Sequence, residues 1–147
     1  MYTLFLGSDH GGFGLKQELI RILGGSGYDV VDCGTDGPNP VDYPDIAKNV
    51  CQLVKSRENA LGILCCGTGI GMSISANKID GIRAALCAES YSAKMARVHN
   101  DANVLCLGAR VIGVELAREV VSAFLGASFE GDRHARRLEK ITLLEQA

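Results

Sequence analysis

Apolar residues in this chain gather in short runs, and between these runs they recur every three or four positions. The runs lie at residues 2–7, 28–33, 62–66, 82–87 and 104–107, and few polar residues interrupt them, among them Asp29, Asp32 and Arg83. Strands that are apolar throughout are typical of a parallel sheet with helices on both faces. The pattern therefore predicts five strands in one buried sheet.

The segments between the strands have the period of amphipathic helices, as at Leu15, Leu19 and Leu23, or at Ile46 and Val50. Further helices are expected after residue 71, over 88–98 and 113–125, and from 131 towards the end. Loops are expected through residue 45 and over 99–103. Alternating strands and helices form α/β folds. We expect residues 1–147 to form one domain, a three-layer doubly wound (Rossmann-like) five-stranded parallel sheet of order 2-1-3-4-5 with a C-terminal helix.

In that strand order, the direction in which strands are added to the sheet reverses between the first and third strands. Ligands bind at such a point, outside the carboxyl ends of the strands. The turn after the first strand is Ser8–Gly12, and the turn after the third is Cys66–Gly71. These two polar, glycine-rich turns are therefore predicted to face each other.

The turn Cys66–Gly71 has glycine at every second position and leads into a helix. A glycine turn before a helix aims backbone N–H groups at one point, which can hold a phosphate or an oxyanion. Met72 occupies the place of the third glycine of a dinucleotide fingerprint, and no Gly-Lys-Ser/Thr follows as in a P-loop. A tight turn without a ligand is the alternative for the glycines alone, but Cys66 adds a candidate nucleophile or base.

Composition narrows the class of protein without identifying it. The chain is 47% apolar and 22% charged, with a net charge of −2, so it has no basic excess for binding nucleic acid. No apolar run reaches membrane-spanning length, and no basic region precedes the apolar start. We expect a cytoplasmic protein that binds neither nucleic acid nor membrane.

The six cysteines do not have the pattern of a metal site, because no Cys-x-x-Cys pair is present. They are Cys33, Cys51, Cys65, Cys66, Cys87 and Cys106. Most lie in apolar runs, where cysteine packs as a small hydrophobic residue. We expect five of them to be packing residues or inert thiols and Cys66 to be functional.

Four segments of the chain resemble the type B ribose-5-phosphate isomerases. They are Gly7–His10, Asp42–Asp45, Cys66–Lys78 and His99–Arg110, and the resemblance extends from the first strand to the final helix. The wider family includes isomerases of allose 6-phosphate and galactose 6-phosphate. Gly11 stands where many members have alanine, a change expected to be harmless in a glycine turn.

The resemblance implies interconversion of an aldose phosphate and a ketose phosphate through an enediolate, with no metal and no other cofactor. Cys66 corresponds to the base that removes the C2 proton, Thr68 to a proton shuttle, and His99 to the acid or base that opens the sugar ring. Asp9 corresponds to a residue that touches the sugar or phosphate, and we expect it to belong to the catalytic residues with these three. The backbone N–H groups of the glycine turn would stabilise the enediolate oxygen. Another branch of the family has glutamate at the position of Met72, which leaves Cys66 as the only base in this loop.

The residues that the resemblance assigns to substrate binding are His10, Tyr43, Gly67, Gly69, Ile70, Gly71, Asn100, Arg110, Arg133 and Arg137. Arg133 and Arg137 lie one helical turn apart and, with Arg110, resemble a phosphate clamp. A solvated basic face is the better reading of Arg136, and His134 has no assigned role.

Two residues have alternative readings that the sequence leaves open. Asp9 can cap the helix that begins near Gly12, a role compatible with substrate contact. Tyr43 precedes a proline in a loop, where tyrosine often serves only in packing.

His99 follows a helix and precedes a strand, so it should lie at the amino-terminal edge of the sheet, away from the crevice. It could reach a crevice only in another subunit. The resemblance implies a homodimer, possibly a tetramer, whose sites borrow His99 and Asn100 across the interface. The alternative activities are isomerisation of a six-carbon sugar phosphate and non-catalytic binding of a phosphorylated metabolite.

Overall fold

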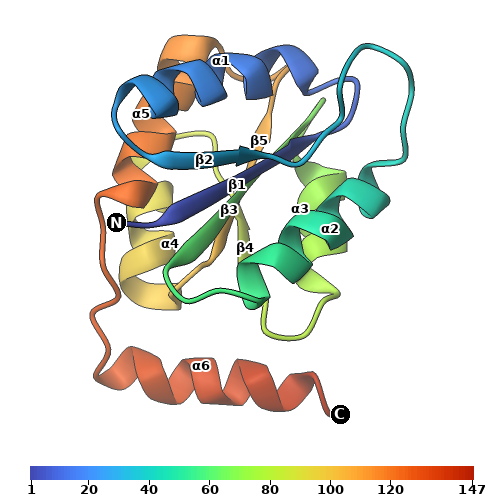
Figure 1. The fold of residues 1–147 in the computed structure, drawn as a ribbon. Helices are drawn as coiled ribbons and strands as arrows, with labels where there is room; N and C mark the ends of the chain where they lie inside the picture. Colours follow the sequence, from blue (N-terminus) through green and yellow to red (C-terminus); the bar gives the residue numbers. More distant parts are fainter.

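The computed structural model describes all 147 residues, and strands and helices alternate along most of the chain (Figure 1). The strands are β1 (Thr3–Ser8), β2 (Asp29–Asp32), β3 (Ala60–Cys66), β4 (Ala84–Leu86) and β5 (Val104–Gly108). The helices are α1 (Phe13–Gly25), α2 (Tyr43–Lys55), α3 (Ile70–Asn77), α4 (Ser90–Asn100), α5 (Val114–Leu125) and α6 (Arg133–Leu144). None of these helices has both the length and the apolar character needed to cross a membrane.

The five strands form one parallel sheet, but their order is 2-1-3-5-4 and the predicted order 2-1-3-4-5 is wrong. β5 is buried at every residue and pairs with β3, whereas the three-residue β4 is partly exposed and lies at the edge. An interior strand is covered on both faces, so the longer and more apolar strand takes that place. The order β2-β1-β3 is as predicted, which leaves the crevice between β1 and β3 unchanged.

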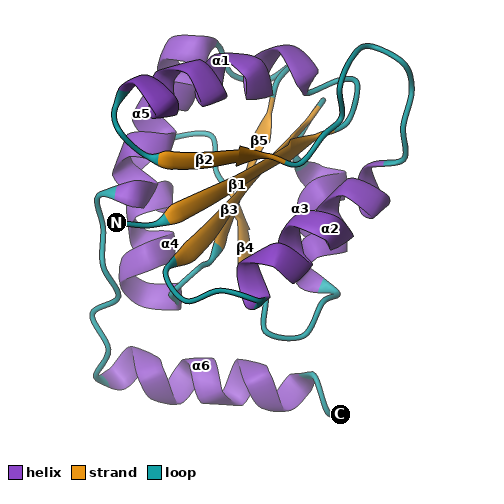
Figure 2. Ribbon diagram, viewed as in Figure 1, coloured by secondary structure: helices purple, strands orange, loops and turns teal.

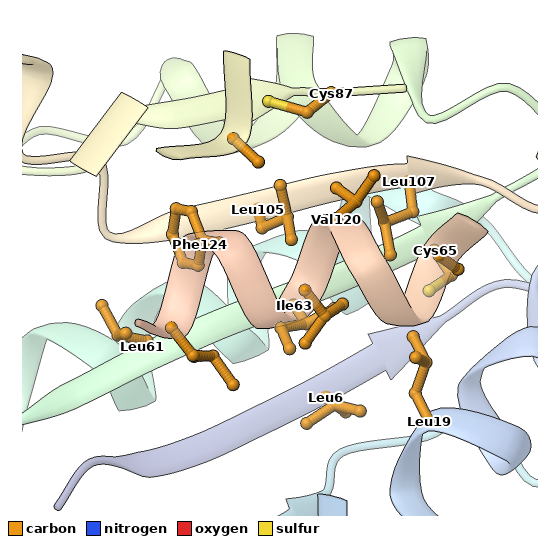
Figure 3. Packing of buried hydrophobic residues seen from close by; sticks show 14 of the residues in the cluster. Leu6, Leu19, Leu61, Ile63, Cys65, Cys87, Leu105, Leu107, Val120 and Phe124 are labelled. Carbon is orange, nitrogen blue, oxygen red and sulfur yellow. The ribbon is translucent and has the colours of Figure 1, made fainter. Parts of the chain in front are cut away.

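Helices cover both faces of the sheet, which gives the three layers that the sequence predicts (Figure 2). Alternate side chains of each strand enter different cores. Leu6 and Ile63 pack with Phe124 under α1, α4 and α5 (Figure 3), whereas Phe5 and Leu64 pack under α2 and α3. The sheet is thus held rigidly from both sides, and the turns at its ends are fixed in space.

Two helices extend further than the sequence predicts. α2 begins at Tyr43, with a proline in its first turn, so residues 43–45 are helical and not loop. α4 continues through Asn100, and the chain leaves it at Asp101 with a left-handed φ of 44°. Because proline is well tolerated in a first helical turn, Pro44 starts the helix where we expected a loop.

α6 stands apart from the rest of the molecule, beyond the amino-terminal ends of the strands (Figure 1). It packs mainly against α4, and Glu145, just beyond its end, accepts a hydrogen bond from the N–H of Gly81 at 2.8 Å. Its Ile141, Leu143 and Leu144 side chains are 42%, 63% and 71% exposed. The apolar face of α6 is therefore only partly covered within one chain.

Candidate active site

The turns that follow β1 and β3 lie side by side at the carboxyl edge of the sheet, the edge at which the strands end. Ser8 and Cys65 are paired in the sheet register, so both turns leave the sheet at the same level. A Cβ atom at Gly12 would lie 2.5 Å from the carbonyl carbon of Cys65, which means that only glycine permits this approach. The predicted juxtaposition of the two turns is confirmed.

Cys66 ends β3 and points its sulfur at the start of α3. The side chain is buried, and the backbone N–H of Gly69 donates to its Sγ at 3.1 Å. Gly69 has a φ of 79°, and a Cβ there would lie 2.5 Å from the Leu86 side chain, so the turn requires glycine at this position. The sulfur therefore accepts an amide hydrogen bond at the positive end of α3.

The other five cysteines have environments that keep them protonated. Burial raises the pKa of Cys65 to about 12, raises the pKa values of Cys33, Cys51 and Cys87 to about 11, and raises that of Cys106 well above its usual range. None of the six cysteines forms a disulfide. The expectation that these five are packing residues or inert thiols agrees with their burial and pKa values.

The backbone amides of the glycine turn divide into two groups. The N–H groups of Gly69 and Ile70 donate to the Sγ of Cys66 and to the Oγ1 of Thr68, the latter at 3.2 Å. The N–H groups of Gly67 and Thr68 have no acceptor within the chain. These two donors, together with the exposed Thr68 hydroxyl, are available to a substrate oxygen beside the thiol.

Asp9 lies at the opposite side of the crevice, in the turn after β1. It is buried, and its Oδ1 accepts the N–H of Gly12 at 3.0 Å, which holds the turn before α1. The N-cap of α1 is Gly12 and has no side-chain cap hydrogen bond, so the alternative that Asp9 caps this helix is wrong. The Oδ2 atom of Asp9 accepts no hydrogen bond within the chain. One carboxylate oxygen is thus structural while the other can contact a ligand.

His10 and Tyr43 border the same crevice. The N–H of Val41 donates to Nδ1 of His10 at 3.3 Å, so in the neutral imidazole the proton is on Nε2, where it can be donated to a ligand. The ring of Tyr43 packs on Gly71, where an added Cβ would lie 2.6 Å from its Cζ. Tyr43 thus has a packing contact, and because the side chain is still 40% exposed, a role in substrate binding stays a prediction.

Arg110 places a positive charge over the gap between the two turns. Its backbone N–H donates to the carbonyl of Gly67 at 2.9 Å. Its guanidinium nitrogens lie 3.1 Å from the position that a Cβ would take at Gly67 and 3.6 Å from the corresponding position at Gly11. The exposed guanidinium can therefore pair with an anionic group held between the turns.

A buried lysine supports this edge of the sheet from behind. Nζ of Lys16, which is fully buried, donates to Asp32 Oδ1 at 2.6 Å and to the carbonyl of Thr35 at 2.7 Å. Hydrogen bonding to Lys16 and to the N–H of Gly34 lowers the pKa of Asp32 despite partial desolvation. Thr35 in turn donates its N–H to the carbonyl of Ser8. We did not predict from the sequence that Lys16 is buried and supports the site. Its position on the apolar face of a helix could have indicated the burial.

His99 and Asn100 occupy the last turn of α4 and lie at the amino edge of the sheet, where the strands begin (Figure 1). This position agrees with the prediction for His99. Arg133 and Arg137 belong to α6 at the same edge. α5 runs back from the carboxyl edge to the amino edge, so the helix that follows it must begin there. Within one chain, Arg133 and Arg137 are therefore not brought together with Arg110.

The His99 side chain has a partner that the sequence did not predict. Its ring stacks on that of His134 with centroids 4.4 Å apart and an angle of 18° between the planes. His134 is 5% exposed, and burial lowers the pKa of its imidazole, with the charges of Arg133 and His99 lowering it further. His134 sits between Arg133 and Arg137 in sequence, but nothing in the sequence indicates the stacking.

Two arginines hold the chain that follows His99. Nε of Arg83 donates to the carbonyls of Asn100 and Asp101 at 2.9 and 3.0 Å. Nη1 of Arg97 donates to Asp101 Oδ1 at 3.0 Å and to the carbonyl of Ala102 at 2.7 Å. Arg97 is 5% exposed, so these bonds are made in a largely dry environment and fix the end of α4.

The comparisons with known proteins agree with this arrangement. The family described as Ribose/Galactose Isomerase matches residues 4–141. The chain is 50% identical to the ribose-5-phosphate isomerase B of Escherichia coli, over 99% of this chain and 98% of that protein. It is 46% identical to the D-erythrulose-4-phosphate isomerase of Pectobacterium atrosepticum, over 99% of this chain and 96% of that protein.

Among solved structures, the ribose-5-phosphate isomerase B of Clostridium thermocellum superimposes with a TM-score of 0.96 at 52% identity. That comparison covers 98% of this chain and 97% of the other. The chain therefore belongs to the ribose/galactose isomerase family, together with the type B ribose-5-phosphate isomerases, and it is an isomerase.

Proposed function

We propose that this protein interconverts ribose 5-phosphate and ribulose 5-phosphate, with Cys66 as the base that moves the C2 proton. The observation that carries the proposal is the hydrogen bond from the N–H of Gly69 to the Sγ of Cys66 at the start of α3. Relatives that match the whole chain are named ribose-5-phosphate isomerase B, which supports the choice of substrate.

The chemistry assigns one role to each group beside the sulfur. The Cys66 thiolate takes the proton from C2 of the open-chain aldose, and the electron pair of that C–H bond forms the enediolate. The free N–H groups of Gly67 and Thr68 donate to the enediolate oxygen as charge develops on it. The Thr68 hydroxyl relays a proton between O2 and O1, and the Cys66 thiol returns its proton to C1. The products balance without a redox partner.

The sugar ring must be opened before this step. The residue proposed to open it lies at the amino edge of the sheet, away from Cys66. His99 would act as the acid or base on the ring oxygen, and Arg133 and Arg137 would bind the phosphate with Arg110. Since His99 and Cys66 occupy opposite edges of one sheet, a second copy of the chain must bring its own His99 to this crevice. The site is therefore shared between two protomers.

The exposed apolar residues of a single chain support such a homodimer. Ile70 and Ile74 are 51% and 58% exposed, one turn apart on α3 beside the glycine turn. Ile141 and Leu144 of α6 border a cavity of about 660 Å³ that also includes Asn100. Exposed apolar side chains that gather in this way are found at interfaces between protein chains. A second copy would cover both regions while it completes the site.

An alternative substrate remains within the same reaction class. The matching family is described by both ribose and galactose, and one full-length relative is named for D-erythrulose 4-phosphate. Cys66, Thr68 and the proposed role of His99 act on the first carbons of the sugar, which all these substrates share. The distance between Cys66 and the phosphate-binding arginines would determine which length of sugar fits the site.

The test is direct measurement of isomerisation. Purified protein is mixed with ribose 5-phosphate, allose 6-phosphate or galactose 6-phosphate, and formation of ketose is followed by ultraviolet absorbance. Erythrulose 4-phosphate is already a ketose, so its turnover is followed as loss of that absorbance. We expect turnover to be fastest with ribose 5-phosphate. Faster turnover of another sugar phosphate would reassign the substrate, and binding of all four without turnover would indicate a non-catalytic phosphometabolite-binding protein.

A further inference from the structure

Three potential metal ligands converge at the amino edge of the sheet. His99 comes from α4, Glu130 from the segment that precedes α6, and His134 from α6 itself. Each offers one nitrogen or oxygen atom, and these three atoms lie within 4.8 Å of one another. Two imidazoles and one carboxylate are thus held together by elements that are distant in sequence.

His134 provides a second and independent indication of a ligand. The residue is 5% exposed, and its Nε2 is buried with no hydrogen-bond partner. Buried polar atoms almost always have a partner in folded proteins, so an imidazole nitrogen left without one needs an explanation. A cation bound between the three side chains would satisfy it.

The donor set selects the kind of cation. Two nitrogens and one carboxylate oxygen suit Zn²⁺ and similar transition metals, whereas Ca²⁺ and Mg²⁺ prefer oxygen ligands alone. Bonds of about 2.0–2.2 Å to zinc require the three atoms to approach one another more closely than they do here. The two outer ligands can move, since His99 is only half-buried and Glu130 is exposed.

Two contacts must be given up when a cation binds. The rings of His99 and His134 are stacked with 18° between their planes, and an imidazole binds a metal in its own ring plane, so the His99 ring must turn out of the stack. Glu130 pairs with Arg133 at 3.7 Å, and both side chains are largely exposed. Exposed ion pairs of this length contribute little to stability. The competition with Arg133 and the nearby positive charge of Arg137 will weaken metal binding without preventing it.

We propose that His99, Glu130 and His134 form a binding site for Zn²⁺ and similar divalent transition metals, and that the bound ion inhibits the enzyme. The inhibition rests on the proposed function, because the ion would occupy the His99 imidazole that is needed to open the sugar ring. It would also draw Glu130 away from Arg133. The site is complete within one chain and lies at the edge of the sheet opposite Cys66.

The competing location for a soft metal is the Cys66 thiol. Co²⁺ distinguishes the two, because a thiolate ligand produces an intense charge-transfer band in the near ultraviolet and nitrogen or oxygen ligands do not. We expect Co²⁺ bound to the chelator-treated protein to show ligand-field absorption without that band. A charge-transfer band that disappears in Cys66→Ala would place the metal at the cysteine and overturn the proposal.

The quantitative test uses isothermal titration of the metal-free full chain with ZnCl₂. Glu130→Gln and His134→Gln should each weaken binding by about tenfold or more, since each removes a ligand. Glu139→Gln is the matched control, because Glu139 is an exposed carboxylate on α6, the helix of His134, and lies outside the cluster. Equal zinc affinity in the wild-type protein and in both ligand variants would overturn the site.

The inhibitory role is tested by turnover of ribose 5-phosphate with and without ZnCl₂. Glu130→Gln should keep its basal turnover and lose most of the inhibition, whereas Glu139→Gln should be inhibited like the wild type. Zinc binding at the cluster without inhibition would refute the inhibitory role. Absence of turnover in the metal-free wild type would instead count against the proposed function, while the titration still decides the metal site.

Discussion

The backbone N–H of Gly69 donates a hydrogen bond to the Sγ of Cys66 at 3.1 Å, across the turn that joins β3 to α3. The left-handed backbone of Gly69 makes this contact possible, since a side chain there would meet Leu86. The same turn leaves the amides of Gly67 and Thr68 free. The proposed base and the proposed oxyanion donors therefore belong to one short segment.

Substitution of Cys66 should remove isomerisation and preserve binding. Cys66→Ala is expected to lower kcat by at least ~10²–10⁴-fold, the usual contribution of a general base, while the phosphate contacts remain. Cys66→Ser should be almost as slow, because a serine hydroxyl is a much weaker acid. Cys65→Ala, whose side chain points into the other core, should cost only packing. Full turnover by Cys66→Ala would place the base elsewhere.

Alkylation should single out Cys66 among the six cysteines. Iodoacetamide reacts with thiolates, and a raised pKa means that less thiolate exists at a given pH. Cys33 and Cys51, with pKa values of about 11, should become reactive only as the pH rises towards that value. Peptide mass spectrometry at pH 7 should therefore find Cys66 modified first, and ribose 5-phosphate should protect it. Faster modification of another cysteine would contradict this assignment.

Mixed protomers test whether sites are shared. His99→Asn should slow turnover of the cyclic sugar, and so should Cys66→Ala, but a heterodimer of the two contains one intact site. After random subunit exchange, about a quarter of wild-type activity should return, since half of the dimers are mixed and each has one site of two. A mixture of Cys66→Ala with Cys66→Ser should remain inactive. No recovery after proven exchange would mean that His99 acts within its own chain or not at all.

The arginines of α6 should differ according to their position on the helix. Arg133→Ala and Arg137→Ala are each expected to raise KM for ribose 5-phosphate by about tenfold to a hundredfold, because a hydrogen bond to a charged group contributes ~1.5–3 kcal/mol. Turnover of unphosphorylated ribose should be the same in these variants as in the wild type, because ribose has no phosphate for the arginines to bind. Arg136→Ala should be nearly silent. Equal effects at Arg136 and Arg137 would indicate only a general basic surface.

Gly71 should be needed for the position of Tyr43. In Gly71→Ala the new methyl group would meet the Tyr43 ring, which can swing into solvent because it is 40% exposed. Stability should fall by only about 1 kcal/mol, the low end for an overpacked site, while kcat/KM falls clearly. Gly14→Ala in α1 is the control, since its Cβ would meet no atom within 4 Å and should leave turnover unchanged. Equal kcat/KM in both variants would remove Tyr43 from the site.

The periodicity of apolar residues was enough to predict all five strands and the helices between them, because each element needs a buried face of its own period. The same pattern located the turns Ser8–Gly12 and Cys66–Gly71 at one edge of the sheet. Both follow strands that pair in parallel, so their meeting depends only on topology. The place of His99 at the opposite edge was predictable for the same reason. These conclusions need only local sequence and the rule that parallel strands share a direction.

Other features depend on which distant segments pack together, and no local pattern contains that information. We did not predict that β5, not β4, pairs with β3, because both strands come from apolar runs; β5 is the longer and more apolar of the two, but only the folded sheet shows that it is the one buried in the interior. The stacking of His134 on His99 and the salt bridge from Lys16 to Asp32 likewise join elements separated along the chain. From sequence alone, a polar side chain in a helix is expected to be exposed. Only the folded structure shows that a distant residue lies beside it as a partner. Tertiary structure therefore decided the strand order and the support of the site, because both arise from contacts between residues that the sequence keeps far apart.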